Sequence, residues 1–253
     1  AWKLSTINSS FHQRISANSE TGNSLRLSDD HFEGTRSIEV IISSKNVLAL
    51  KTILEVDQIE NYLLTKYGCR SVFSVNSVIK RMNRYQHYGT RSFYRLPDEL
   101  SSEMVWDLMK YKDKLGLGNA VTEDHETLRI IGRLPDIGSA DADKRNVRLV
   151  TYLEKFQTDG QRVFISGSSY VKDQSTMRVT YLILIGIALS LLIVGIIASI
   201  VFRSVKVGVI SILPNLLPLL GALIFIEVLG IGLNAPSVMA LSILLGLSLD
   251  DTI

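Results

Sequence analysis

Two adjacent aspartates, Asp250 and Asp251, lie at the end of a long apolar stretch and are the residues best suited to chemistry in this sequence. A charged side chain inside a bilayer costs about 2.5–3.5 kcal/mol on insertion scales, so such a residue indicates function by default. Burial and mutual repulsion both favour the neutral form of a carboxyl group. A carboxyl group that titrates near ambient pH can take a proton from one side of a membrane and release it on the other. The pair therefore predicts a proton relay, with H+ as the coupling ion.

The position of the pair fits that role. Counted from Pro236, Asp250 lies about 21 Å along a helix, inside a hydrocarbon core about 30 Å thick. Neighbouring helix positions point roughly 100° apart, so one carboxylate can face a partner helix and the other a water-filled path. Gly246 lies one turn before Asp250 on the same face, which predicts close packing of another helix there. The alternative is that the helix ends near Asp250 and leaves both carboxylates among cytoplasmic headgroups.

Three apolar segments form the C-terminal part of the chain, at about 181–203, 207–229 and 236–253. Tyr181–Phe202 has 22 residues and no charge, whereas a helix needs about 20 apolar residues to cross the hydrocarbon core. Residues 1–180 have an ordinary polar composition. The sequence thus predicts a polar domain at 1–180, followed by a transmembrane region at 181–253 with three helices, the last of them truncated.

Charge placement predicts the orientation. Arg203 and Lys206 form the one basic loop of the apolar part, and short basic loops stay on the cytoplasmic side. The polar domain then lies on the opposite side, as the extracytoplasmic or periplasmic part of a multi-pass protein of the inner, or cytoplasmic, membrane. Glu227 lies near the external end of its span and is expected at the membrane interface.

Two prolines, Pro214 and Pro218, interrupt the second apolar segment. Each removes a backbone donor and bends a helix, which membrane helices tolerate when neighbouring groups satisfy the freed carbonyls. They predict either a kinked entry segment near the cytoplasmic surface or a moving hinge.

The polar domain alternates between strand and helix patterns. β-Branched or alternating runs predict strands at 37–43, 71–75, 127–134 and 162–167, and apolar spacing predicts helices at 48–66, 78–88, 98–111 and 140–156. Two strand–helix–strand units predict a ferredoxin-like α+β sandwich, a split βαβ arrangement, with the helices on one face of the sheet. Residues 85–124 form an insertion between the two units.

Several functional classes find no support in the composition. The formal net charge is +2, which gives no reason to expect nucleic acid as a partner. Cys69 is the single cysteine, and His12, His31, His87 and His125 lack metal-ligand spacing. The sequence has no nucleophile elbow, Walker loop or dinucleotide fingerprint. We therefore expect no enzyme, no metal and no cofactor.

The order of these features resembles one half of a resistance–nodulation–division (RND) superfamily exporter, of the MMPL-like branch that exports hydrophobic compounds. The motifs that carry the resemblance are GTRSIEVIIS (Gly34–Ser43), VFISGSS (Val163–Ser169), FRS (Phe202–Ser204), PNLLPL (Pro214–Leu219), GIGLN (Gly230–Asn234) and GLSLDD (Gly246–Asp251). The resemblance implies that residues 1–180 are a porter domain that handles substrate. It implies that Asp250 and Asp251 are proton-relay positions of a fourth helix. It also implies a fragment of one half, closer to the C-terminal half.

The resemblance further implies the partners: the lipid bilayer, a hydrophobic or amphiphilic substrate, the homologous half of the same polypeptide, and a homo-oligomer or periplasmic protein as further options. Three other functions stay open. They are an accessory subunit of protein secretion, a non-transporting sterol or lipid sensor, and a membrane-anchored binding domain. Proton flux in reconstituted vesicles separates an exporter from a sensor, and tolerance of leucine at both aspartates would indicate the anchored domain.

Overall fold

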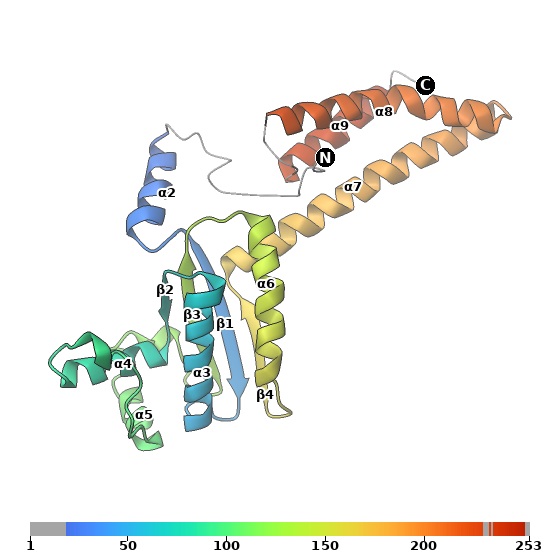
Figure 1. Cartoon of the computed structure of the whole chain (residues 1–253). Coiled ribbons are helices and arrows are strands. Elements are labelled where there is room, and N and C mark those ends of the chain that lie inside the picture. The colour runs from blue at the N-terminus through green and yellow to red at the C-terminus, as the bar shows by residue number, and fades with distance from the viewer. Residues whose placement is uncertain (1–18, 230–232, 234, 251–253) are drawn as a thin grey trace. The chain divides into compact units, whose positions relative to one another are not determined.

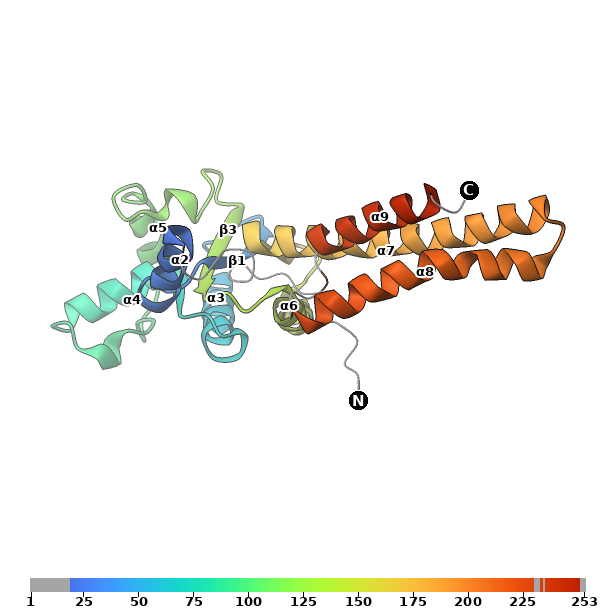
Figure 2. The same cartoon turned by 90° about the horizontal axis from the view of Figure 1, so that it is seen from above.

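The computed structural model describes residues 19–229, 233 and 235–250, which belong to two compact units (Figures 1 and 2). The sheet unit comprises Ile15–Ile137 and Ala142–Val171, and the helical unit holds Lys172–Ile253 with two short earlier stretches. The first contains a small antiparallel sheet, and the chain has two long apolar helices. The expected combination of an α+β domain with apolar helices is therefore confirmed.

The sheet unit is built on four strands in the order β2-β3-β1-β4, and every neighbouring pair is antiparallel. The bounds are β1 Arg36–Ser44, β2 Ser71–Phe73, β3 Thr127–Leu134 and β4 Gln161–Ser166. Helix α3 (Leu50–Tyr62) follows β1, and helix α6 (Ser139–Leu153) joins β3 to β4. Both helices lie on the same face of the sheet (Figure 1).

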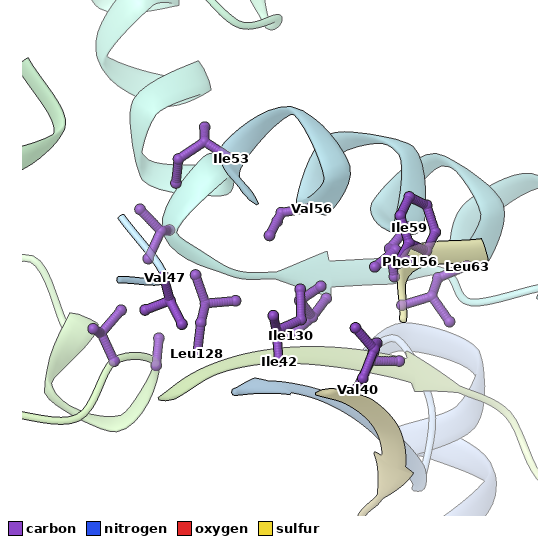
Figure 3. Packing of buried hydrophobic residues seen from close by; sticks show 14 of the residues in the cluster. Val40, Ile42, Val47, Ile53, Val56, Ile59, Leu63, Leu128, Ile130 and Phe156 are labelled. Carbon is purple, nitrogen blue, oxygen red and sulfur yellow. The ribbon is translucent and has the colours of Figure 1, made fainter. Parts of the chain in front are cut away.

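The core of the sheet unit lies between that face and the two helices (Figure 3). Alternate residues of β1 point inward, so that Ile38, Val40 and Ile42 are buried while their neighbours are only partly covered. The inward side chains of the helices are Ile53, Val56 and Ile59 from α3 and Leu149 and Leu153 from α6. Replacing one such residue by alanine typically costs about 2–5 kcal/mol. Burial of the whole set holds the strands in register, because a slip of one residue would expose all of these side chains.

Strand β2 is shorter than the predicted strand at 71–75, and helix α4 (Val75–Gln86) begins inside that segment. The reason is a helix cap at Ser74. Its hydroxyl accepts a hydrogen bond from the backbone N–H of Asn76 (2.9 Å), and its own N–H donates to Oγ of Ser77 (3.1 Å). This reciprocal capping stabilises the helix start and ends the strand early.

Two further helices differ from the sequence prediction. Helix α5 (Ser102–Met109) is shorter than the predicted 98–111, because the hydroxyl of Ser101 caps it by accepting from the N–H of Met104 at 3.2 Å. Helix α2 (Glu20–His31) was not expected, since its sequence has few apolar residues. Its start is capped by Ser19, whose Oγ accepts from the N–H of Gly22 at 3.0 Å.

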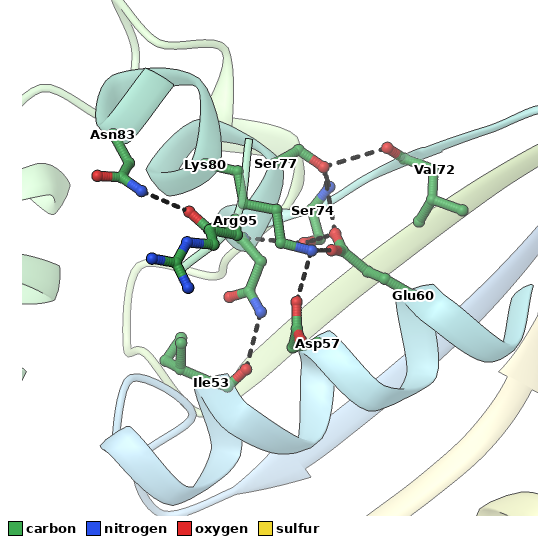
Figure 4. Close-up of polar contacts among 10 residues, drawn as sticks. Ile53, Asp57, Glu60, Val72, Ser74, Ser77, Lys80, Asn83 and Arg95 are labelled. Carbon is green, nitrogen blue, oxygen red and sulfur yellow. Dashed lines mark hydrogen bonds and ion pairs between the residues drawn. The ribbon is translucent and has the colours of Figure 1, made fainter. Parts of the chain in front are cut away.

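A buried polar cluster ties α4 to α3 (Figure 4). Glu60 of α3 accepts from Oγ of Ser74 (2.6 Å) and from Nζ of Lys80 (2.6 Å), and Nζ of Lys80 also lies 2.5 Å from Asp57. Burial acts to lower the pKa of Lys80, but the carboxylates of Glu60 and Asp57 outweigh it and the pKa is raised. Because Glu60 is buried and fully paired, the cluster fixes the position of α4.

The helical unit contains α7 (Ser168–Val201) from Lys172 onward, together with the apolar helices α8 (Val205–Val228) and α9 (Ala235–Asp250). By length and composition, α7 and α8 can each cross a membrane, whereas α9 is a shorter apolar helix. Helix α7 begins before Tyr181, where its uncharged part starts. Helix α9 runs back alongside α8 (Figure 2), and Leu219 and Ile226 share an apolar cluster with Leu241 and Leu245.

Candidate proton-relay site

Helix α9 leads to the predicted relay pair. Its residues are apolar apart from serines and the terminal aspartate, and Pro236 lies in the first turn, where a backbone N–H has no helical partner. The structure follows the backbone of α9 to Asp250, and the side chain of that residue lies outside the description. Asp251 lies outside the described residues. The role of the pair therefore stays a prediction, which the surroundings of α9 can support.

One face of α9 is used for packing. Val238, Leu241 and Leu245 are buried and follow one another at helical spacing. Leu241 and Leu245 join the cluster that also holds Leu219 and Ile226 of α8. This contact fixes α9 in rotation, so the remaining faces of the helix are defined as well.

A different face of α9 is open in the described part of the chain. Met239 is 50% exposed and Ile243 is 66% exposed. A Cβ atom added to Gly246 would meet nothing within 4 Å. Position 250 follows Gly246 by one turn and shares this face. The predicted close packing of another helix at Gly246 thus stays a prediction, and the face offers room for it.

Asn215 is a polar residue of the apolar region that the sequence prediction did not single out. It lies in α8, is fully buried, and its Nδ2 donates to the carbonyl oxygen of Ser211 at 3.2 Å. At about 1.5 Å per residue, Asn215 lies about 20 Å from the end of α8, and Asp250 lies about 22 Å from the start of α9. Because the two helices run side by side in opposite directions (Figure 2), Asn215 and Asp250 lie at a similar depth. The polar amide of Asn215 within the apolar motif PNLLP is the sequence signal that could have identified it.

The predicted hinge residues, Pro214 and Pro218, both lie inside α8, whose backbone is helical on each side of them. The prolines remove two donors from the helix, so the carbonyls one turn earlier lose their usual partners. The structure thus shows a helix with two internal prolines, and a fixed kink or a hinge at these residues stays a prediction.

Small residues bring α7 and α8 close together near the turn that joins them. A Cβ atom on Gly208 would lie 1.7 Å from Oγ of Ser199 and 2.5 Å from the carbonyl oxygen of Gly195. The hydroxyl of Ser199 donates to that same carbonyl at 2.7 Å, which satisfies it within α7. Close approach through small residues one turn apart is the usual packing device of membrane helices.

The described part of the sheet unit presents no group of three or more His, Cys, Asp or Glu residues that could hold a metal ion. Two of the four histidines make aromatic contacts. His87 stacks on Phe93 with ring centroids 3.8 Å apart, and His125 meets Trp106 edge-on at 4.8 Å. Cys69 is buried, and burial raises the pKa of its thiol to about 12, so that it stays protonated.

An α+β domain followed by apolar helices, two of them long enough to span a bilayer, defines the class of integral membrane proteins. The chain belongs to the MMPL family, because the model of that family matches residues 71–250. The matched segment runs from β2 to Asp250 and so takes in both units. Proteins of this family are transporters of the RND type. A search of the curated proteins found no match to the chain.

Proposed function

We propose that the chain is part of an RND-type exporter, driven by the proton-motive force, that moves lipids or other hydrophobic and amphiphilic compounds. The observation that carries the proposal is the family match, which extends through the helix that ends at Asp250. Membership of a transporter family makes an energy source necessary. An intramembrane carboxylate pair is the group in this sequence that can supply proton coupling.

In this proposal Asp250 and Asp251 carry the proton, and Asn215 of α8 is a positioning residue at a similar depth, which reaches the pair through water because position 250 shares the open face of α9. The similar depth of Asn215 and Asp250 supports this arrangement. A buried amide can donate a hydrogen bond to an ionised carboxylate and accept one from a protonated carboxyl group. Such a neighbour would stabilise both states of a relay that must change its charge in each cycle.

We assign the open face of α9, with Met239, Ile243 and Gly246, to the relay helix of a homologous half of the transporter. A helix of the same class needs an apolar surface and a small residue at the point of closest approach. The exposed Met239 and Ile243 and the absent side chain of Gly246 supply both. The coupling ion is H+, and we propose no bound cofactor.

The sheet unit is the porter domain in this proposal. The strand order β2-β3-β1-β4, with α3 after β1 and α6 between β3 and β4, supports the ferredoxin-like split βαβ arrangement. We place this domain on the extracytoplasmic side and the chain in the inner membrane, because Arg203 and Lys206 mark the short turn between α7 and α8 as cytoplasmic.

The test is the replacement of each aspartate by asparagine in the full-length transporter, with efflux of a lipophilic dye from energised cells as the measurement. Asp250→Asn and Asp251→Asn each keep the size of the side chain and remove the titrating group. We expect export to stop while the amount of protein in the membrane is unchanged. Glu227→Gln is the matched control, since Glu227 is an exposed acid in the last turn of α8 and should tolerate the change. Normal efflux in both aspartate variants would disprove the relay.

A further inference from the structure

Residues 80–95, here named the basic tip, have an unusual composition for one exposed segment. The sequence KRMNRYQHYGTRSFYR contains five Lys or Arg residues, three tyrosines and no Asp or Glu. It comprises the second half of α4 and the turn that follows, which reach outward from the sheet (Figure 1). The sequence predicts a helix at 78–88 and an insertion from residue 85 for this segment, and the proposed export mechanism does not use it.

The positive charges of the basic tip are in part already paired and in part available. Lys80 is bound to Glu60 and Asp57, and Arg95 lies 2.8 Å from Asp98. Arg81, Arg84 and Arg91 are exposed, and within the described chain no carboxylate lies within 4 Å of them. Three guanidinium groups on one projecting segment thus lack an internal counter-charge.

The aromatic residues of the basic tip contribute little to folding. Tyr85 is 86% exposed and Tyr88 is fully exposed, at 101%. Tyr88 also has a φ of 54°, in the left-handed region that a bulky residue adopts only at a cost of about 1–2 kcal/mol. A strained, fully exposed aromatic side chain gains nothing from the rest of the sheet unit. Such an outlier indicates a role outside the fold.

Internal bonds hold the basic tip in one shape. The buried Asn83 donates from Nδ2 to the carbonyl oxygens of Phe93 (3.1 Å) and Arg95 (3.0 Å), the latter drawn in Figure 4. Nε of Arg84 donates to the carbonyl oxygen of Gly89 at 2.8 Å, and the ring of His87 stacks on Phe93. The polar contacts therefore use the inner side of the tip. Its outer side is pre-organised, which lowers the entropy lost on binding.

We propose that the basic tip docks on the anionic headgroups of a lipid bilayer. Arginine binds phosphate groups through charge-assisted, often bidentate hydrogen bonds. Tyrosine prefers the headgroup level, where its ring is apolar and its hydroxyl is wet. The absence of acidic residues from the tip removes the repulsion that an anionic surface would exert. A protein of the MMPL family lies in a membrane, so a bilayer is always close to its polar domain. This inference does not depend on proton-driven export.

An environment-sensitive dye on the basic tip can report the docking. Gln86 is exposed, so Gln86→Cys gives a labelling site, while the single native cysteine, Cys69, is buried and protonated. The whole protein is placed in nanodiscs of phosphatidylcholine, or of phosphatidylcholine with phosphatidylglycerol, and vesicles of either composition are then added. We expect a blue shift of the dye only when phosphatidylglycerol is present in the disc or in the vesicles, and its loss at high salt.

Two variants separate docking from folding. Arg81→Gln/Arg91→Gln removes charges that form no hydrogen bond within the described residues. It should lower the apparent affinity for vesicles with phosphatidylglycerol, read from the dye shift, by about thirtyfold. Tyr88→Gly removes the exposed ring and relieves the left-handed strain, so it should weaken the response while thermal stability stays equal or rises. Lys66→Gln/Lys114→Gln, with the same charge loss on two exposed lysines elsewhere in the sheet unit, is the control and should respond like the wild type. The proposal is overturned if wild type shows no shift with phosphatidylglycerol, even if it binds an acidic protein, or if the control loses as much as the arginine variant.

Discussion

Asn215 shows what a single polar residue can add to an apolar helix. It is fully buried, and one of its hydrogen bonds goes to the carbonyl oxygen of Ser211 within α8. Buried polar groups in membrane helices are expensive unless they have partners, and they are usually retained for function. We therefore connect Asn215 to the relay, at a depth similar to that of Asp250.

We predict that Asn215→Leu lowers proton-coupled efflux by about tenfold, the loss of one hydrogen bond to a charged group. The substitution keeps the branching of the side chain at Cγ, although leucine is larger, and it leaves an apolar helix, so membrane insertion and the amount of protein should not change. The control is Leu217→Ala, a substitution at an exposed site of the same helix, which should leave efflux unchanged. Unchanged efflux in Asn215→Leu would remove Asn215 from the relay and leave the aspartates untouched.

At the scale of elements, the helix pair α7–α8 depends on two glycines whose surroundings differ from those of other glycines in the same region. Gly195 and Gly208 face the opposite helix, whereas a side chain on Gly186 or Gly221 would meet nothing within 4 Å. The difference follows from the crossing point of the two helices, which their tight turn places near these residues.

We predict that Gly208→Val destabilises the α7–α8 pair by about 1–3 kcal/mol, because the added side chain overlaps Ser199. The measurement is the midpoint of thermal unfolding of the purified protein in detergent. Gly221→Val makes the same chemical change in the same helix at an open position, so its midpoint should match that of the wild type. Equal midpoints for both variants would show that the close crossing contributes no stability.

The elements with strong patterns were predictable from the sequence. Strand β3 was predicted with its observed bounds, since its alternation and its flanking polar residues leave little choice. The boundaries at Ser74 and Ser101 were not, because the same residues suit a strand end, a turn or a helix cap until their hydrogen bonds are known. Helix α2 lacked the apolar period that reveals a helix.

The candidate site shows the same division. The types and spacing of Asp250 and Gly246 were enough to predict a relay helix, because charge and small size are unusual in an apolar stretch. The burial of Asn215 and the crossing at Gly208 depend on how three helices pack. Packing is a property of tertiary structure that a run of uniformly apolar residues does not encode in its period.

At the scale of the whole molecule, the orientation of the chain follows from the charges of the turn between α7 and α8. We predict that Ser204→Cys, in that turn, reacts with a membrane-impermeant maleimide only from the cytoplasmic side, and Gln86→Cys only from the opposite side. The native Cys69 should stay unlabelled in both, since its thiol is buried and protonated. Labelling of both positions from one side would contradict the topology, whatever the role of the aspartates.

The relay itself is tested most directly by proton flux through the full-length transporter in proteoliposomes that contain a pH-sensitive dye. With an imposed pH gradient and an amphiphilic substrate present, we expect the wild type to dissipate the gradient faster than protein-free vesicles. Asp250→Asn/Asp251→Asn should match the protein-free vesicles, and Glu227→Gln should match the wild type. Wild-type flux in the double asparagine variant would contradict the proposal that Asp250 and Asp251 carry the protons.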